Sequence, residues 1–162
     1  MTELLERQLL SKGELVTRLQ PREREVKTLP ARSESAPEKP VVVLIVEDHF
    51  EMRSLAASYL RQIGYRVIEA ENAAEGMSVF CSGTHVDIVF SDVYMQGDLN
   101  GHAFARWLAE CRPSVPMLLT SAMPNEAQLI SAGTLRHFIA KPYHLDEVDW
   151  QIQTMLCLAS LM

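Results

Sequence analysis

Apolar runs and amphipathic stretches alternate along the chain from Val41 onward. The run Val41–Val46 is β-branched and contains no polar residue, which is typical of a strand buried on both faces of a parallel sheet. A helix is predicted from about Glu51 to Gln62, where apolar side chains recur at helical spacing, and Gly64 suits its C-terminal end. Further strands are predicted at Tyr65–Ala70, Val86–Phe90, Val115–Leu119 and Leu135–Ala140. Further helices are predicted at Asn72–Phe80, capped by Asn72 with Glu75, at His102–Cys111 and Asn125–Ala132, and from Leu145 towards the C-terminus.

This alternation predicts an α/β fold: a (βα)5 doubly wound sheet of five parallel strands. Parallel strands joined by helices cross over with right-handed geometry, so the helices should cover both faces of the sheet. The ends of the first, third, fourth and fifth strands then lie at one edge. That edge should collect five polar residues, Glu47, Asp48, Asp92, Thr120 and Lys141.

The first 40 residues have a different pattern. Residues 2–19 place apolar positions near one helix face, and Gly13 interrupts them. Two interpretations stay open for them, a weakly helical or disordered tail and a helix that docks on a partner or packs on the fold. Residues 20–40 hold four prolines among charges and serines, which is typical of a linker. We therefore expect an N-terminal extension with a proline-rich linker at residues 1–40 and a folded domain at residues 41–162.

Composition and charge narrow the classes of function. The chain is 48% hydrophobic and 22% charged, as in globular proteins. Residues 41–162 carry 7 basic and 14 acidic side chains, a poor match for nucleic-acid binding. The three cysteines lack CxxC spacing, which favours a reduced, intracellular chain. No apolar run reaches the about 18 to 20 residues of a membrane span, and the N-terminus lacks the apolar core of a signal peptide. We expect a cytoplasmic protein that binds neither nucleic acid nor membrane.

Three carboxylates at one sheet edge repel one another unless a cation neutralises them. Glu47, Asp48 and Asp92 offer only oxygen ligands, which Mg²⁺ prefers, so they predict a divalent-metal site. Lys141 and Thr120 add an ammonium and a hydroxyl, which suit the oxygens of a phosphoryl group attached to a carboxylate. The five histidines show no metal-ligand spacing, and we expect no histidine metal site.

Four segments, in this order and at strand ends, are characteristic of a known family. They are Val43–Asp48, Phe90–Met95, Leu118–Ala122 and Phe138–Tyr143. Over about residues 41–162 the chain resembles the receiver domain of two-component response regulators, of the single-domain type. The resemblance implies the flavodoxin-like receiver fold. It also implies that Asp92 accepts a phosphoryl group from a histidine kinase or a histidine phosphotransfer protein.

The resemblance implies roles for the other residues of this edge. The ligands implied for Mg²⁺ are Glu47, Asp48, Asp92 and the backbone carbonyl of Tyr94. Thr120 and Lys141 would bind the phosphoryl oxygens, and movement of Thr120 would draw the aromatic ring of Phe138 inward. Such a protein is not an enzyme for a separate substrate, because it at most catalyses its own phosphorylation and dephosphorylation.

Some positions depart from the usual pattern of the family. Gln96 stands where proline is usual, Glu47 replaces the more frequent aspartate, and the loop after Asp92 looks one residue longer than the commonest form. Two other functions stay open, a degenerate receiver that binds a partner without phosphorylation and a hydrolase with an aspartyl intermediate. Tyr94 counts against the hydrolase, because that class places a second acidic residue two positions after its nucleophile.

The last helix carries more apolar surface than one buried stripe requires. Residues Met155–Met162 are apolar nearly all round. We expect no further domain after this helix, so output should occur through contact with a downstream protein that the sequence does not identify. The apolar surface predicts either packing against residues 2–19 or an interface with a partner or with a second copy, as in a homodimer.

Overall fold

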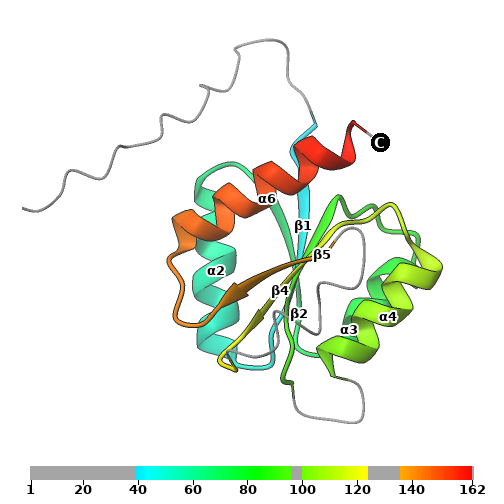
Figure 1. The fold of residues 1–162 in the computed structure, drawn as a ribbon, viewed down its shortest axis with the longest axis horizontal. Coiled ribbons are helices and arrows are strands. Elements are labelled where there is room, and N and C mark those ends of the chain that lie inside the picture. Colours follow the sequence, from blue (N-terminus) through cyan, green and yellow to red (C-terminus); the bar gives the residue numbers. More distant parts are fainter. Residues whose placement is uncertain (1–38, 96–99, 124–135, 162) are drawn as a thin grey trace, which may run out of the picture. The chain divides into compact units, whose positions relative to one another are not determined.

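The computed structural model describes residues 39–95, 100–123 and 136–161 (Figure 1). The helices expected within residues 2–19 and 125–132 lie outside the described residues, as does nearly all of the expected linker. In the described part of the chain, no helix is both long and apolar enough to cross a membrane.

Five parallel strands of the described chain form one sheet, as the sequence predicted, and the structure shows their order in that sheet to be β2-β1-β3-β4-β5. They are β1 (Val42–Val46), β2 (Arg66–Ala70), β3 (Ile88–Asp92), β4 (Met117–Ser121) and β5 (Arg136–Ala140). The central strands β1, β3 and β4 are buried along their whole length, because both faces of the sheet are covered. The mixed polarity of β2 agrees with its place at an edge.

Helices cover both faces of this sheet. Those described are α2 (Phe50–Gln62), α3 (Ala73–Cys81), α4 (Gly101–Cys111) and α6 (Leu145–Ala159). Helices α2 and α6 lie on one face, and α3 and α4 lie on the other (Figure 1). Alternate residues of β1 divide between the two cores, with Val43 and Ile45 packed beneath α2 and α6, and Leu44 and Val46 beneath α3 and α4. Each such buried aliphatic side chain stabilises the fold by about 1.5–3 kcal/mol.

The strand β3 extends beyond the apolar run that predicted it. Ser91 and Asp92 are polar, yet their backbones pair in register with Val46 of β1 and Thr120 of β4. Strand pairing uses main-chain groups, so an apolar pattern alone does not show where a strand ends. As a result, the sheet itself holds Asp92 and Thr120 side by side.

Local signals set the predicted ends of two helices. The Asn72 Oδ1 atom accepts a hydrogen bond from the N–H of Glu75 at 2.9 Å, which confirms the predicted cap of α3. Gly64 follows α2 with a φ of 100°, a left-handed conformation that glycine adopts without strain. Both boundaries lie close to those predicted from the sequence.

Candidate functional site

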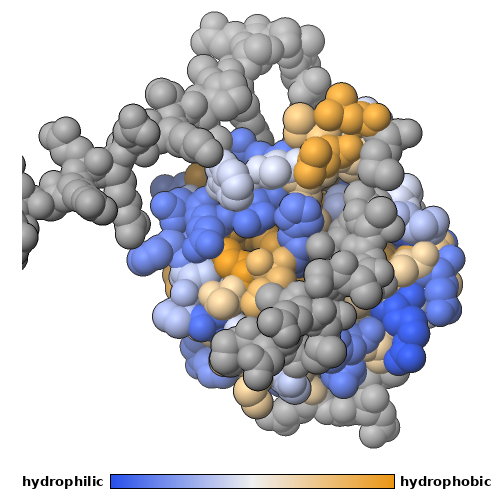
Figure 2. Space-filling model, viewed as in Figure 1, coloured by the Kyte–Doolittle hydropathy of each residue, from blue (hydrophilic) through white to orange (hydrophobic). Residues whose placement is uncertain are grey.

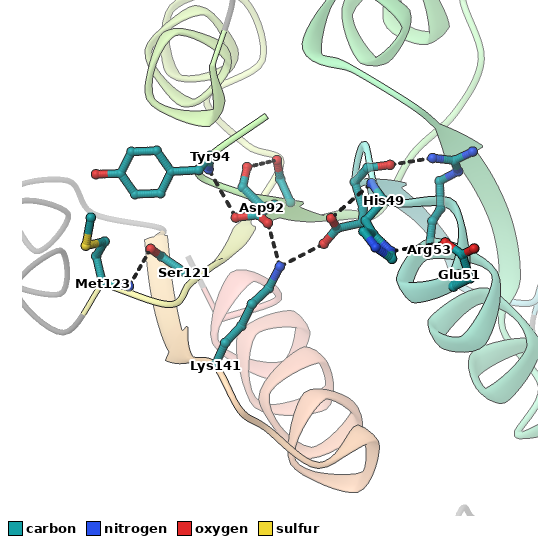
Figure 3. A network of polar contacts seen from close by, with 10 residues as sticks. His49, Glu51, Arg53, Asp92, Tyr94, Ser121, Met123 and Lys141 are labelled. Atoms are coloured by element: carbon teal, nitrogen blue, oxygen red, sulfur yellow. Dashed lines mark hydrogen bonds and ion pairs between the residues drawn. The ribbon is translucent and has the colours of Figure 1, made fainter. Parts of the chain in front are cut away.

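The carboxyl edge of the sheet brings three of the expected residues into contact. Asp92 ends β3, Glu47 follows β1, and Lys141 follows β5. The Lys141 Nζ atom donates to Asp92 Oδ2 at 2.5 Å and to Glu47 Oε2 at 3.0 Å (Figure 3). Both carboxylates are buried, so a single ammonium group joins two buried acids from different strands.

Burial and charge act against each other in this cluster. Burial raises the pKa of Glu47 above its ordinary value; Lys141 lowers this pKa in part, and Asp92 raises it again. Burial lowers the pKa of Lys141, but the hydrogen bonds to Asp92 and Glu47 outweigh that effect and leave the pKa raised. Lys141 is therefore charged at neutral pH, and the cluster holds two acidic groups against one cation.

The Thr120 hydroxyl is the other polar group beside Asp92, on the neighbouring strand β4. The Thr120 side chain is buried, and its Oγ1 atom has no hydrogen-bond partner among the residues that the structure describes. A buried polar group without a partner costs about 1–3 kcal/mol, so its presence requires an explanation. A ligand oxygen bound at Asp92 would supply the missing acceptor.

The backbone after Asp92 is held tightly against the start of α4. The Tyr94 N–H donates to Asp92 Oδ1 at 3.1 Å and orients the carboxylate. The Gly101 N–H donates to the Val93 carbonyl at 2.9 Å. A Cβ atom at Gly101 would lie 2.3 Å from the Asp92 carbonyl oxygen, so only glycine permits this approach. The side chain of Tyr94 is exposed at the rim of the site.

The residues predicted to hold Mg²⁺ follow β1 and β3 at this same edge. Glu47 and Asp92 direct carboxylate oxygens at one point, the Lys141 ammonium, and Asp48, the residue after Glu47, is half-buried. As placed, the described residues contain no group of three His, Cys, Asp or Glu side chains that could share one ion. The chemistry of the donors nevertheless fits Mg²⁺, which binds through one or two carboxylates and keeps several waters.

Phe138, the expected switch aromatic, lies on β5 in register with Leu119 of β4. Its ring is half-buried and packs against the core beneath α3 and α4. The next residue of β5, Ile139, is the register partner of Thr120. Phe138 is thus one position from the partner of Thr120, and its movement stays a prediction.

Two further residues at this edge were not singled out from the sequence. Arg53 donates from Nη1 to the Glu47 carbonyl at 2.5 Å, and its only sequence signal is its place in the first turn of the helix after the acidic pair. Tyr143 packs edge-on against Phe90 with ring centroids 5.7 Å apart, and burial raises its pKa to about 12. Its signal is its place two residues after Lys141.

Comparison with known proteins agrees with this geometry. The sequence profile of the response regulator receiver domain matches residues 43–153. The chain is 33% identical over 87 residues to the autoinducer 1 sensor kinase/phosphatase LuxN of Vibrio campbellii. The matched residues make up 54% of this chain and 10% of LuxN. The chain is also 26% identical over 116 residues to the probable transcriptional regulator ycf27 of Cyanophora paradoxa. This match covers 70% of this chain and 47% of ycf27.

Solved structures share the architecture. The response regulator TrrA of Thermotoga maritima, in complex with Mg(2+)-BeF, has a TM-score of 0.64 at 25% identity and covers 71% of this chain and 98% of TrrA. A response regulator receiver protein from Sinorhizobium medicae has a TM-score of 0.69, covering 75% of this chain and 98% of that protein. At 19% identity, this second likeness shows the fold alone.

These comparisons define the family and leave the activity of the whole protein open. The chain spans less than half the length of LuxN and of ycf27. Some relatives are transcriptional regulators, so they lend no support to the expectation that the chain does not bind nucleic acid. The profile match covers most of the chain, and the strand order and structural neighbours agree with it. The chain therefore belongs to the response regulator receiver domain family of two-component signalling.

Proposed function

We propose that residues 41–162 form a receiver domain that accepts a phosphoryl group on Asp92 from a histidine kinase or a histidine phosphotransfer protein. One observation carries the proposal. Asp92 contacts Lys141 beside the Thr120 hydroxyl, which has no partner in the described part of the chain. A carboxylate nucleophile, an ammonium and a hydroxyl donor are the groups that suit an aspartyl phosphate. Residues 1–40 are, in this proposal, an extension that precedes the domain.

Transfer requires that an Asp92 oxygen bonds to phosphorus while the bond from phosphorus to the imidazole nitrogen of the donor breaks. Negative charge spreads over three phosphoryl oxygens in the transition state, so catalysis depends on positioning and electrostatic stabilisation. Lys141 brings an ammonium that already contacts Asp92, and it would bind one of these oxygens. The Thr120 hydroxyl would donate to another, which satisfies a donor that is otherwise buried without a partner.

Mg²⁺ at this edge would supply further positive charge to the phosphoryl oxygens. The ligands that we propose are Glu47, Asp48, Asp92 and the backbone carbonyl of Tyr94. The oxygen-only donor set supports this assignment, as does the relative TrrA, which was solved in complex with Mg(2+)-BeF. In this proposal the domain is a phosphoacceptor that at most catalyses its own phosphorylation and dephosphorylation.

Exposed apolar side chains near the site provide a surface for the phosphodonor. Phe50 and Leu55 of α2 are 64% and 59% exposed, and Met123, just after β4, is 55% exposed. Exposed large apolar side chains are enriched at protein contact sites. The donor must bring its histidine to Asp92, so we propose that it binds across this rim.

A second apolar surface lies on α6 and is our candidate for output. Trp150, Leu158 and Leu161 are exposed, and Figure 2 shows apolar atoms gathered over the C-terminal turns of this helix. Phosphorylation would engage the Thr120 hydroxyl and move Phe138, and the change would be transmitted to a downstream protein or to a second copy of the chain. The alternative that α6 packs against residues 2–19 lies outside the described residues.

We further propose a cytoplasmic location. Cys81, Cys111 and Cys157 are free and exposed. Exposed free thiols are typical of proteins that remain in a reducing compartment. A cytoplasmic domain would also meet the phosphohistidine donors on which this function depends.

Labelling with acetyl phosphate and Mg²⁺ tests the proposal. We expect intact-mass measurement to show one phosphoryl group on the wild type and none on Asp92→Asn. Asp87→Asn, changed at the other end of β3, should label like the wild type. Continuous hydrolysis of acetyl phosphate would favour a hydrolase. Absence of label would favour the alternative, a degenerate receiver that acts as an interaction module without phosphorylation.

A further inference from the structure

A second charged network meets the main chain of Glu47, the residue whose carboxylate contacts Lys141 (Figure 3). Arg53, in the first turn of α2, directs its guanidinium at the loop that follows β1, and its Nη1 atom donates to the Glu47 main-chain carbonyl at 2.5 Å. The Arg53 main-chain N–H donates to the His49 carbonyl at 3.0 Å. One residue therefore binds the carbonyls at both ends of the loop that carries Glu47 and Asp48.

Arg53 is itself held in place. Its Nε atom lies 3.8 Å from Glu69 Oε2 on β2, and Glu69 Oε1 lies 2.9 Å from Arg61 Nη1. The Arg53 guanidinium also lies over the Phe50 ring, 5.6 Å from its centroid. The Arg53 side chain is only 12% exposed. These contacts fix the guanidinium before any ligand arrives.

The contacts of Arg53 indicate that it affects the orientation of Glu47 and Asp48 more than the net charge of the site. Glu69 offsets positive charge in this network, and the bond that reaches the site goes to a carbonyl, not to a carboxylate. The peptide plane between Glu47 and Asp48 determines the directions in which both side chains leave the backbone. A charge-assisted hydrogen bond to that carbonyl opposes rotation of the plane.

We propose that Arg53 is a positioning residue, which holds the acidic pair in the orientation that binds Mg²⁺. This inference rests on the proposed function, because it concerns the same site. Mutation of groups that orient metal ligands typically weakens metal binding by about 10- to 100-fold. Arginine suits the role because its planar fork offers Nη1 to the carbonyl while Nε faces Glu69, which a lysine ammonium does not reproduce.

The test measures Mg²⁺ binding by isothermal titration calorimetry in the absence of a phosphodonor. We expect R53Q to weaken Mg²⁺ binding by about 10-fold, the lower end of the range for residues that orient metal ligands. R53K should recover only part of the loss. The matched control is R61Q, because Arg61 contacts Glu69 without reaching the acidic loop, and its affinity should stay close to that of the wild type.

A second readout separates positioning from general damage to the fold. At saturating Mg²⁺, acetyl phosphate should label R53Q at a rate that returns towards the wild-type rate, because the defect lies in metal affinity. If R53Q does not fold, E69Q keeps Arg53 and removes its second anchor. Weaker Mg²⁺ binding by E69Q then supports the proposal, and unchanged binding counts against it.

The outcomes distinguish the two proposals. A wild type that binds Mg²⁺ and labels, together with an R53Q variant of equal Mg²⁺ affinity, overturns the role of Arg53 alone. Equal losses in R53Q and R61Q also overturn it, because they indicate a general disturbance of the contacts around Glu69, whereas loss of a positive charge alone would favour Mg²⁺. A wild type that neither binds Mg²⁺ nor labels overturns the proposed function and this inference with it.

Discussion

Asp87 and Asp92 stand at the two ends of the strand β3, and their surroundings differ. Asp87 precedes the strand, where its Oδ2 atom accepts from the Val42 N–H at 2.7 Å and its Oδ1 atom lies 2.8 Å from His85 Nε2. The side chain of Asp87 is 30% exposed, whereas that of Asp92 is 10% exposed. Asp92 instead contacts Lys141, an ammonium that it shares with a second acid.

The difference separates a structural carboxylate from a reactive one. Each oxygen of Asp87 has its own partner, and these partners join the start of β1 to the loop before β3. Both oxygens of Asp92 also have partners, the Tyr94 N–H and Lys141, but Asp92 shares this cation with a second acid. The Thr120 hydroxyl on the neighbouring strand has no partner within the described ranges. A site with shared charge and an unpaired donor gains from a ligand, whereas a satisfied site does not. An aspartate at a strand end is thus a functional candidate when its neighbours are left unsatisfied.

Removing the side chain that contacts the aspartate at each end of β3 should give the largest contrast in labelling rate. Lys141→Gln removes the charge that stabilises the developing phosphoryl charge, and acetyl phosphate labelling should slow by about 100-fold or more. His85→Gln removes an exposed partner of Asp87, and labelling should stay at the wild-type rate, because an exposed contact of this kind contributes at most about 0–1 kcal/mol. Intact-mass time courses measure both rates. Wild-type labelling by Lys141→Gln would remove the main argument for this site.

Replacing a glycine by alanine near each end of β3 should give a smaller contrast in labelling rate. Gly101→Ala would place Cβ 2.3 Å from the Asp92 carbonyl oxygen, so the backbone must move. We expect a loss of about 1–3 kcal/mol in unfolding free energy, with slower labelling. Gly83 has a φ of 78° and open space around it, so Gly83→Ala should cost about 1–2 kcal/mol through backbone strain and leave labelling intact.

Urea unfolding and labelling, measured on both alanine variants, check this prediction. The losses of stability expected for Gly101→Ala and Gly83→Ala overlap in size. The labelling rate is therefore the measurement that distinguishes the two variants. Equal labelling rates would contradict the view that the approach of α4 fixes the geometry of Asp92.

The smallest expected effect is a dependence of stability on pH at the carboxyl edge. Burial raises the pKa of Glu47 above 4.5, so the folded protein binds this proton more tightly than the unfolded chain does. The resulting stabilisation is fully present below the unfolded pKa and is lost as the pH rises through the folded pKa. Glu47→Gln should therefore flatten the decline of stability above about pH 4.5.

Urea unfolding at a series of pH values without Mg²⁺ measures this slope. Wild-type protein with Mg²⁺ is the control, because a bound cation favours the ionised carboxylate and should reduce the slope. The same slope in the wild type and in Glu47→Gln would assign the effect to another group.

Much of the fold and part of the site could be predicted from the sequence alone. Continuous apolar runs such as Val42–Val46 indicated buried parallel strands, and parallel topology placed Asp92, Thr120 and Lys141 at one edge. Arg53 could not be predicted, because its bond to the Glu47 carbonyl depends on how α2 packs after the loop. A main-chain acceptor leaves no signal in the sequence.

The amino-acid pattern was enough to predict which strands and helices follow one another along the chain, and which polar residues come at the ends of the strands. This was possible because the spacing of apolar residues and the residues that cap helices determine local structure over a few neighbouring positions. The folded chain was needed to show that Lys141 bonds to both Asp92 and Glu47, and that Thr120 has no partner within the described residues. Such contacts depend on strand register and on packing at both faces of the sheet, which involve residues far apart in the chain.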